Sequence, residues 1–203
     1  MLPIPPITQA LMLICTAAYF LDLLIRSFTG FSLNLWMALW PLGNGIFMPW
    51  QPFTYALVQQ DITALLFNML GMWMFGGELE RLWGQKRYAQ FLFAAVIAAS
   101  VCYLLLSLAT GARAPFIGSS PVIYAMLAAS AILFPNRTIM PLIPPIPMKQ
   151  RTYVLAFGAV MLALGLSSLG GIAPFAQLGG ALGAWLIIRF WRGQAPFPPR
   201  KRR

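Results

Sequence analysis

The 203-residue chain contains no histidine, only four acidic residues and only two cysteines. Charged residues make up 9% of the sequence, whereas a soluble domain contains about 25%. This shortage of charge excludes a soluble globular enzyme, a disordered tail and a coiled coil. Hydrophobic residues, in contrast, make up 60% of the chain. The composition therefore predicts an integral membrane protein.

The formal net charge of +10 is not distributed as in a nucleic-acid-binding protein. Basic and aromatic residues do not interleave on a common surface, so we expect no nucleic-acid partner. Basic residues occupy positions 200–203, and most others lie between hydrophobic runs. Such clusters are typical of topology determinants and of contacts with lipid headgroups. Cys15 and Cys102 lie in apolar runs as small buried hydrophobes, and we expect no metal or cofactor.

A membrane-spanning helix needs about 20 mostly apolar residues, and six runs reach or approach that length. We predict an all-α bundle of six transmembrane helices. It forms a single domain over residues 1–203, with a short basic cytoplasmic tail at about 192–203. The runs are 7–25, 61–77, 88–109, 120–134, 152–168 and 174–191. The fourth and fifth are short, so they must lie inside the bundle or in locally thinned membrane.

The distribution of cations predicts the orientation of the bundle. With the N-terminus in the cytoplasm, twelve of the fourteen Lys and Arg residues fall on the cytoplasmic side. Only Arg26 and Arg113 then lie outside. We therefore expect both termini in the cytoplasm.

Residues 26–60 form a segment that is too long for a hairpin and too apolar for a free loop. It contains Trp36, Trp40 and Trp50 among glycines and prolines. Aromatic, amphipathic segments lie along the membrane interface, so we expect a long membrane-lying first loop. It acts either as an interfacial anchor or as a lateral wall beside the bundle interior. The proline-rich stretch 141–147 cannot continue a helix and predicts a stiff connector.

The four acidic residues have structural interpretations. Asp22 lies one turn before Arg26, a spacing that permits an i, i+4 ion pair. Glu78 and Glu80 lie beside basic residues at the inner end of the second run, which indicates an interfacial charge network. Asp61 begins that run, where capping of the helix N-terminus is the favoured interpretation.

Asn68 lies in the middle of the second run, where an amide must find hydrogen-bond partners on another helix. Its position is equally compatible with helix association and with donation to an anion. In the fourth run, Ser120 and Tyr124 are four residues apart and share one helix face.

The sixth run contains a face of small residues next to a polar one. Gln177 is followed by Gly179, Gly180 and Gly183, whose spacing allows another helix to approach closely. We expect that neighbour to be the run at 120–134.

These residues form a pattern that resembles the rhomboid family of intramembrane serine proteases, and the match covers nearly the whole chain. The matching motifs are Asn68, Gly76-x3-Glu80-x3-Gly84, Gly118-Ser119-Ser120 with Tyr124-Ala125, and Ala176-Gln177-x-Gly179-Gly180. The resemblance implies a rhomboid-like bundle in a bacterial inner membrane. It implies that Ser120 holds the nucleophile position, and that Asn68 and Tyr124 belong to the oxyanion- and substrate-binding region. The roles that it implies for Glu80 and for the glycines, Gly183 included, are structural.

The sequence departs from the family pattern where the chemistry takes place. The base position, a histidine in the family, is Gln177, whose amide cannot accept a proton. The second-run histidine that helps to bind the oxyanion corresponds to Ala64, and the glycine after the nucleophile corresponds to Pro121. The lysines are expected on the opposite side of the membrane from Ser120. Serine is also a favoured N-cap residue, and proline is a favoured first residue of a helix. We therefore expect Ser120 to cap the helix that Pro121 begins.

Three functions are compatible with this sequence. The resemblance favours a catalytically impaired pseudoprotease that keeps the fold and binds transmembrane helices of client proteins. The second is an active intramembrane serine endopeptidase with an unrecognised base. The third is a small transporter, which is disfavoured because almost no ionisable residue lies at mid-membrane depth. The expected partners are the lipid bilayer and the transmembrane segments of clients or substrates.

Overall fold

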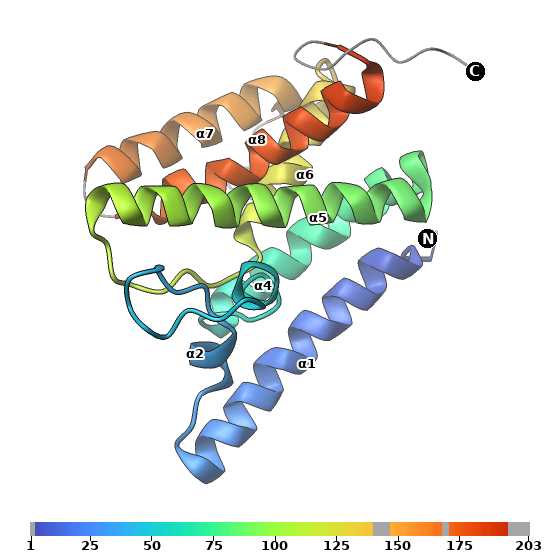
Figure 1. Cartoon of the computed structure of the whole chain (residues 1–203). Coiled ribbons are helices and arrows are strands. Elements are labelled where there is room, and N and C mark those ends of the chain that lie inside the picture. Colours follow the sequence, from blue (N-terminus) through green and yellow to red (C-terminus); the bar gives the residue numbers. More distant parts are fainter. Residues whose placement is uncertain (1–2, 140–146, 168–170, 195–203) are drawn as a thin grey trace.

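Helices account for nearly all of the regular secondary structure (Figure 1). The structure is a computed structural model that describes residues 3–139, 147–167 and 171–194. The helices are α1 (Pro6–Thr29), α2 (Leu33–Met37), α3 (Gln51–Thr54), α4 (Ile62–Gly71), the π-helix η1 (Met72–Gly76), α5 (Gly77–Thr110), α6 (Ser120–Leu133), α7 (Gln150–Leu166) and α8 (Ala173–Arg192). In the described residues, β1 (Thr138–Ile139) pairs antiparallel with β2 (Met148–Lys149).

The apolar runs predict most helix bounds to within a few residues. The runs expected at 120–134, 152–168 and 174–191 correspond to α6, α7 and α8. α1 extends beyond its expected end at residue 25, as far as Thr29. Residues 140–146, which form most of the proline-rich connector, and residues 195–203 of the basic tail lie outside the described residues.

The second and third runs form one continuous helical stretch. α4, η1 and α5 follow one another directly, and inside α5 only Gly84 is recorded with non-helical dihedrals (φ 74°, ψ 165°). This left-handed φ carries little steric cost for glycine, so the chain turns there without a loop. α3 is a separate turn that ends at Thr54, and the helix of the second run, α4, begins at Ile62.

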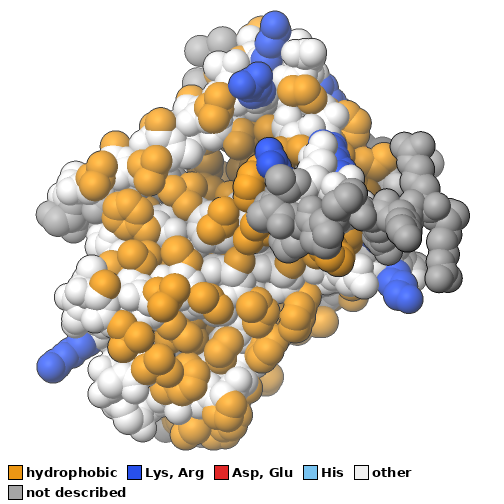
Figure 2. Space-filling model, turned by 45° about the horizontal axis from the view of Figure 1, so that its top comes forward, with side chains coloured by type: hydrophobic (Ala, Val, Ile, Leu, Met, Phe, Trp, Pro, Cys, Tyr) orange, Lys and Arg blue, Asp and Glu red, His pale blue; other side chains and the backbone are white. Residues whose placement is uncertain are grey.

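Two helical stretches of the described chain are long and apolar enough to cross a membrane. They are Pro6–Thr29 and Ile62–Thr110, the second of which Gly84 divides. Large apolar side chains on both face outward; Phe28, for example, is 85% exposed. Figure 2 shows hydrophobic side chains over much of one face, with scattered Lys and Arg side chains. An apolar surface of this extent is compatible with lipid rather than water as the solvent.

α6 lies at the centre of the bundle. It packs against α5, α7, α8 and η1, and buried residues occur throughout its length. Its 14 residues span about 21 Å, less than the hydrocarbon thickness of about 30 Å. This central position agrees with the expectation that the short fourth run lies inside the bundle.

The glycines of α8 contact two helices. A Cβ at Gly179 would lie 2.7 Å from Cβ of Cys102, and one at Gly183 would lie 2.6 Å from Cβ of Ala98, both on α5. Gly180 instead lies against the backbone of Pro121 in α6. The expectation that the small face meets the 120–134 run is therefore correct for Gly180 and wrong for the other two, which pack against α5.

The Gly76–Glu80–Gly84 motif joins α1 to the bundle. Glu80 is 2% exposed, and its carboxylate accepts hydrogen bonds from the backbone N–H groups of Ile7 (2.9 Å) and Thr8 (2.7 Å) and from the Thr8 hydroxyl. A carboxylate at a helix N-terminus accepts hydrogen bonds from backbone N–H groups that would otherwise be unpaired. It also interacts favourably with the positive end of the helix dipole. A Cβ at Gly76 would lie 2.6 Å from the hydroxyl of Tyr88 and 3.3 Å from Cγ2 of Thr8 in α1, so a larger residue there would require these side chains to shift.

The two glutamates of this region therefore have different roles. Glu78 forms a partly exposed ion pair with Arg137, as expected for an interfacial charge network. The same expectation is wrong for Glu80, because burial and the N-terminus of α1 make it an internal cap.

Candidate functional site

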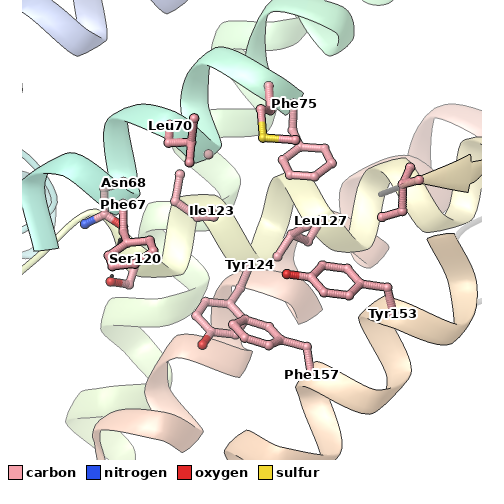
Figure 3. Close-up of a pocket in the computed structure, with 13 residues that line it drawn as sticks. Phe67, Asn68, Leu70, Phe75, Ser120, Ile123, Tyr124, Leu127, Tyr153 and Phe157 are labelled. Carbon is pink, nitrogen blue, oxygen red and sulfur yellow. Dashed lines mark hydrogen bonds between the residues drawn. The ribbon is translucent and has the colours of Figure 1, made fainter. Parts of the chain in front are cut away.

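An apolar pocket of about 410 Å³ lies beside Ser120. It is formed by α4, η1, α6, β1 and α7, and the residues that line it are Phe67, Asn68, Leu70, Gly71, Met74, Phe75, Ser120, Ile123, Tyr124, Leu127, Ile139, Tyr153 and Phe157. In Figure 3, Asn68 and Ser120 lie near each other, and Tyr124 and Phe157 lie further along the pocket. The ring centroids of Tyr124 and Phe157 are 5.4 Å apart in a stacked arrangement. The pocket thus brings together three of the expected site residues: Asn68, Ser120 and Tyr124.

The hydroxyl of Ser120 belongs to a chain of hydrogen bonds. It donates to Oδ1 of Asn68 over 3.5 Å, and Nδ2 of Asn68 donates to Oε1 of Gln59 over 2.8 Å. Nε2 of Gln59 then donates to the hydroxyl of Ser119 over 2.8 Å. The chain therefore links α4, the segment before it and the first turn of α6.

Gln59 is a site residue that the sequence analysis missed. It is 0% exposed, and its backbone carbonyl also accepts a hydrogen bond from Nδ2 of Asn34. The sequence signal was weak, because Gln59 stands next to Gln60 in a short polar stretch and only Gln59 is buried.

Asp22 continues this connection toward α1. Its carboxylate accepts from the Ser32 hydroxyl and from the backbone N–H of Asn34, each over 3.0 Å. Asp22 is 6% exposed. The expected ion pair with Arg26 is absent from the ion pairs of the described residues, because the carboxylate is directed to the start of α2 instead.

The segment between α1 and α4 holds the loop that precedes α6. Leu39 and Phe116 exchange two backbone hydrogen bonds of 3.0 and 2.9 Å, and the N–H of Gly118 donates to the carbonyl of Tyr55. The phenol of Tyr55, which lies outside the long apolar helices, donates to the carbonyl of Val96, and burial raises its pKa above the usual range. The long first loop thus positions the start of α6.

Ser120 does not cap its helix as expected. The N-cap is Ser119, whose carbonyl accepts from the N–H groups of Val122 and Ile123. The first turn of α6 therefore begins one residue earlier than expected, and Pro121 is the second helical residue instead of the first. This shift leaves the Ser120 hydroxyl free to reach Asn68.

Gln177 and Ala64, the two positions at which the resemblance leads us to expect histidines, carry no side chain that can take up a proton from Ser120. Oε1 of Gln177 is buried and has no hydrogen-bond partner among the described residues. Ala64 has only a methyl side chain, and its backbone N–H donates to Asp61. Neither residue lines the pocket.

Asp61 caps α4, as predicted. Its side chain accepts from the N–H of Ala64 over 2.8 Å, and α4 begins at the next residue, Ile62. The carboxylate is therefore engaged at a helix N-terminus rather than directed to Ser120.

In the described residues, no three His, Cys, Asp or Glu side chains cluster as metal ligands would.

Comparisons with known proteins identify the family and relatives of this chain. The family model for the rhomboid domain matches residues 47–193. The rhomboid protease GlpG of Yersinia pestis (strain Pestoides F) is 28% identical over 123 residues, which cover 60% of this chain and 41% of that protein. GlpG of Klebsiella pneumoniae subsp. pneumoniae is 32% identical over 77 residues, which cover 37% of this chain and 26% of that protein.

The matched stretches therefore span less than half the length of these relatives. The family model, in contrast, covers most of this chain, including the pocket, the Gly76–Glu80–Gly84 motif and all of α8. The long apolar helices agree with an integral membrane protein. The chain belongs to the rhomboid family.

Proposed function

We propose that this chain binds transmembrane helices of client proteins at the pocket beside Ser120 and does not hydrolyse them. The observation that carries this proposal is the partner of the Ser120 hydroxyl. That partner is the amide oxygen of Asn68, which cannot take up a proton at ordinary pH. A serine becomes a nucleophile only when an adjacent base accepts its proton.

The pocket suits side chains of a client helix. Its volume of about 410 Å³ is far below that of a whole helix of 20 residues, which is about 2,400 Å³ for a cylinder 10 Å wide and 30 Å long. The lining is mostly aromatic and aliphatic. α7 packs against α6 and α8, and residues of α7 line the pocket on the side opposite α4 and η1. The pocket therefore lies in the gap between α7 and these two helices. We infer that a client helix lies along this gap and inserts a few apolar side chains.

The bundle that we propose for this function has six membrane-spanning helices in an inner bacterial membrane, with both termini in the cytoplasm. α1, the two parts of the 62–110 stretch on either side of Gly84, α6, α7 and α8 provide the six spans. The distribution of cations supports the orientation. A topology reporter fused after Arg203 should report the cytoplasm, and one inserted near Gly111 should report the opposite side. Reversed readouts would refute the orientation.

A photo-crosslinker in the pocket tests client binding directly. A benzoylphenylalanine at Phe157, which lines the pocket, should crosslink to an added transmembrane peptide in liposomes. The matched control is the same replacement at Phe93, an exposed position on α5 outside the pocket. Equal crosslinking at both positions would contradict specific binding at the pocket.

A serine-directed fluorophosphonate probe tests the absence of hydrolysis. The unmodified protein should not be labelled at Ser120 and should not cleave a transmembrane substrate. The triple variant Gln177→His, Ala64→His, Pro121→Gly should be labelled, and this labelling should disappear on adding Ser120→Ala. General-base assistance is usually worth about 10²–10⁴-fold in rate.

The second function, an active intramembrane serine protease, is supported by the position of Ser120 at the edge of the pocket and by the relatives, which are named as proteases. Labelling of the unmodified protein that disappears in Ser120→Ala would establish this function and refute ours.

A further inference from the structure

A second apolar groove lies between α6, α7 and α8, separate from the pocket beside Ser120. Its volume is about 390 Å³. Its walls include Ala131 and Ile132 of α6, Val154 and Leu155 of α7, and Trp185 of α8. The lining also contains Arg151, the second residue of α7.

The groove lies toward the end of the bundle where cations gather. Arg137, which follows α6, pairs with Glu78 at the start of α5, and its carbonyl accepts from the N–H of Gln150 at the start of α7. The ring centroids of Trp83 in α5 and Trp191 in α8 are 5.2 Å apart. These contacts bring the end of α6, the start of α7 and the end of α8 to one end of the bundle.

The electrostatic surroundings of the groove are positive. A second cation, Arg189, lies with its guanidinium carbon 4.4 Å from the ring centroid of Trp185. The four acidic residues have partners outside the groove lining, namely Asp22 with Ser32, Asp61 with Ala64, Glu78 with Arg137 and Glu80 with Thr8. The groove therefore combines apolar walls with a cationic border.

We propose that this groove binds one anionic diacyl phospholipid. The phosphate lies against the guanidinium of Arg151, and one acyl chain lies along Ala131, Val154 and Leu155. Arginine matches the geometry of a phosphate, and basic pockets between membrane helices bind anionic headgroups. Trp185 has the amphipathic ring that is typical of the membrane interface. A phospholipid fits the groove better than free phosphate does, because its acyl chain contacts the apolar walls and free phosphate has no apolar group.

Native mass spectrometry of the whole chain in detergent tests the site, with added phosphatidylglycerol or phosphatidylcholine. We expect the unmodified protein to retain phosphatidylglycerol preferentially. Arg151→Gln should weaken that binding about fivefold, as expected for one basic contact near a lipid surface. The matched control is Arg87→Gln, which removes the same charge from an exposed position outside the groove lining and should leave binding unchanged.

A second variant separates the groove from surface charge. Ala131→Phe fills the apolar wall and keeps every cation, so it should also weaken phosphatidylglycerol binding. Glycerol 3-phosphate, which carries the headgroup charge without acyl chains, should not compete. Equal losses in Arg151→Gln and Arg87→Gln would overturn the proposal in favour of unspecific attraction. Unchanged binding in Ala131→Phe would overturn it as well, because the lipid would then lie outside the groove.

Discussion

Replacing Gly180 by alanine tests the closest helix contact at the site. An added Cβ would lie 2.9 Å from the carbonyl carbon of Pro121 and closer still to its carbonyl oxygen. Carbon atoms are in favourable contact at about 3.5–4.0 Å, so α8 must move away from α6 by roughly half an ångström or more. The obstacle is backbone, and no side-chain rotation can relieve it. Overpacking of this kind costs about 1–3 kcal/mol of folding free energy.

The same substitution in α7 should have the opposite sign. A Cβ at Gly158 would meet no atom within 4 Å. Alanine is favoured over glycine inside a helix by about 0.5–1 kcal/mol, because it loses less backbone entropy on folding. Gly158→Ala should therefore be neutral or slightly stabilising. This comparison isolates the contact of Gly180 from the general effect of adding a methyl group.

Thermal unfolding in detergent, followed by tryptophan fluorescence, measures both variants. A chain of this length changes its melting temperature by about 2–4 °C per kcal/mol. Gly180→Ala should therefore melt about 2–12 °C below the unmodified protein, while Gly158→Ala should melt at the same temperature or slightly above it. Equal shifts of the two variants in the same direction would refute the close packing of α8 on Pro121.

Two further pairs of variants test the polar contacts of the fold. Glu80→Ala should lower the free energy of unfolding by about 1.5–3 kcal/mol, because buried N–H donors of α1 lose their carboxylate partner. Glu78→Ala should lower it by only about 0–1 kcal/mol, because its ion pair with Arg137 is partly exposed. Equal losses would argue against a capping role for Glu80. Gln59→Leu should lower the free energy of unfolding by about 1–3 kcal/mol, because it leaves the buried amide of Asn68 and hydroxyl of Ser119 unpaired. Gln60→Leu, at an exposed position, should change it by less than about 0.5 kcal/mol. A Gln59→Leu variant as stable as Gln60→Leu would contradict the hydrogen-bond chain. Chemical unfolding in mixed micelles measures all four.

The sequence predicts the helices of this fold well because membrane helices are marked by apolar length alone. The bounds of α6 and α8 follow directly from the runs at 120–134 and 174–191. The break at Gly84 could not be located in this way, since the sequence does not tell which of several glycines adopts a positive φ. That choice depends on packing between distant segments.

The polar contacts show the same limit. Glu78 and Glu80 are two residues apart and have similar neighbours in the sequence, yet one is a surface ion pair and the other is a buried cap. The partners of Glu80 lie 72 and 73 residues away along the chain. Gln59 and Gln60 differ in the same manner. Sequence spacing identifies residues that share a helix face, but it does not identify partners that only the folded bundle brings together.

The hydrogen bonds around Ser120 have a structural role that does not depend on hydrolysis. The amide nitrogen of Gln59 donates to Ser119, and its oxygen accepts from the amide nitrogen of Asn68. In this arrangement the oxygen of Asn68 lies toward Ser120, and the Ser120 hydroxyl is the donor. The Ser120 hydroxyl thus donates a hydrogen bond to an amide oxygen, which does not take up the proton itself. The groups around Ser120 stabilise the contact between α4, α6 and the first loop, and this structural role persists without any proton transfer.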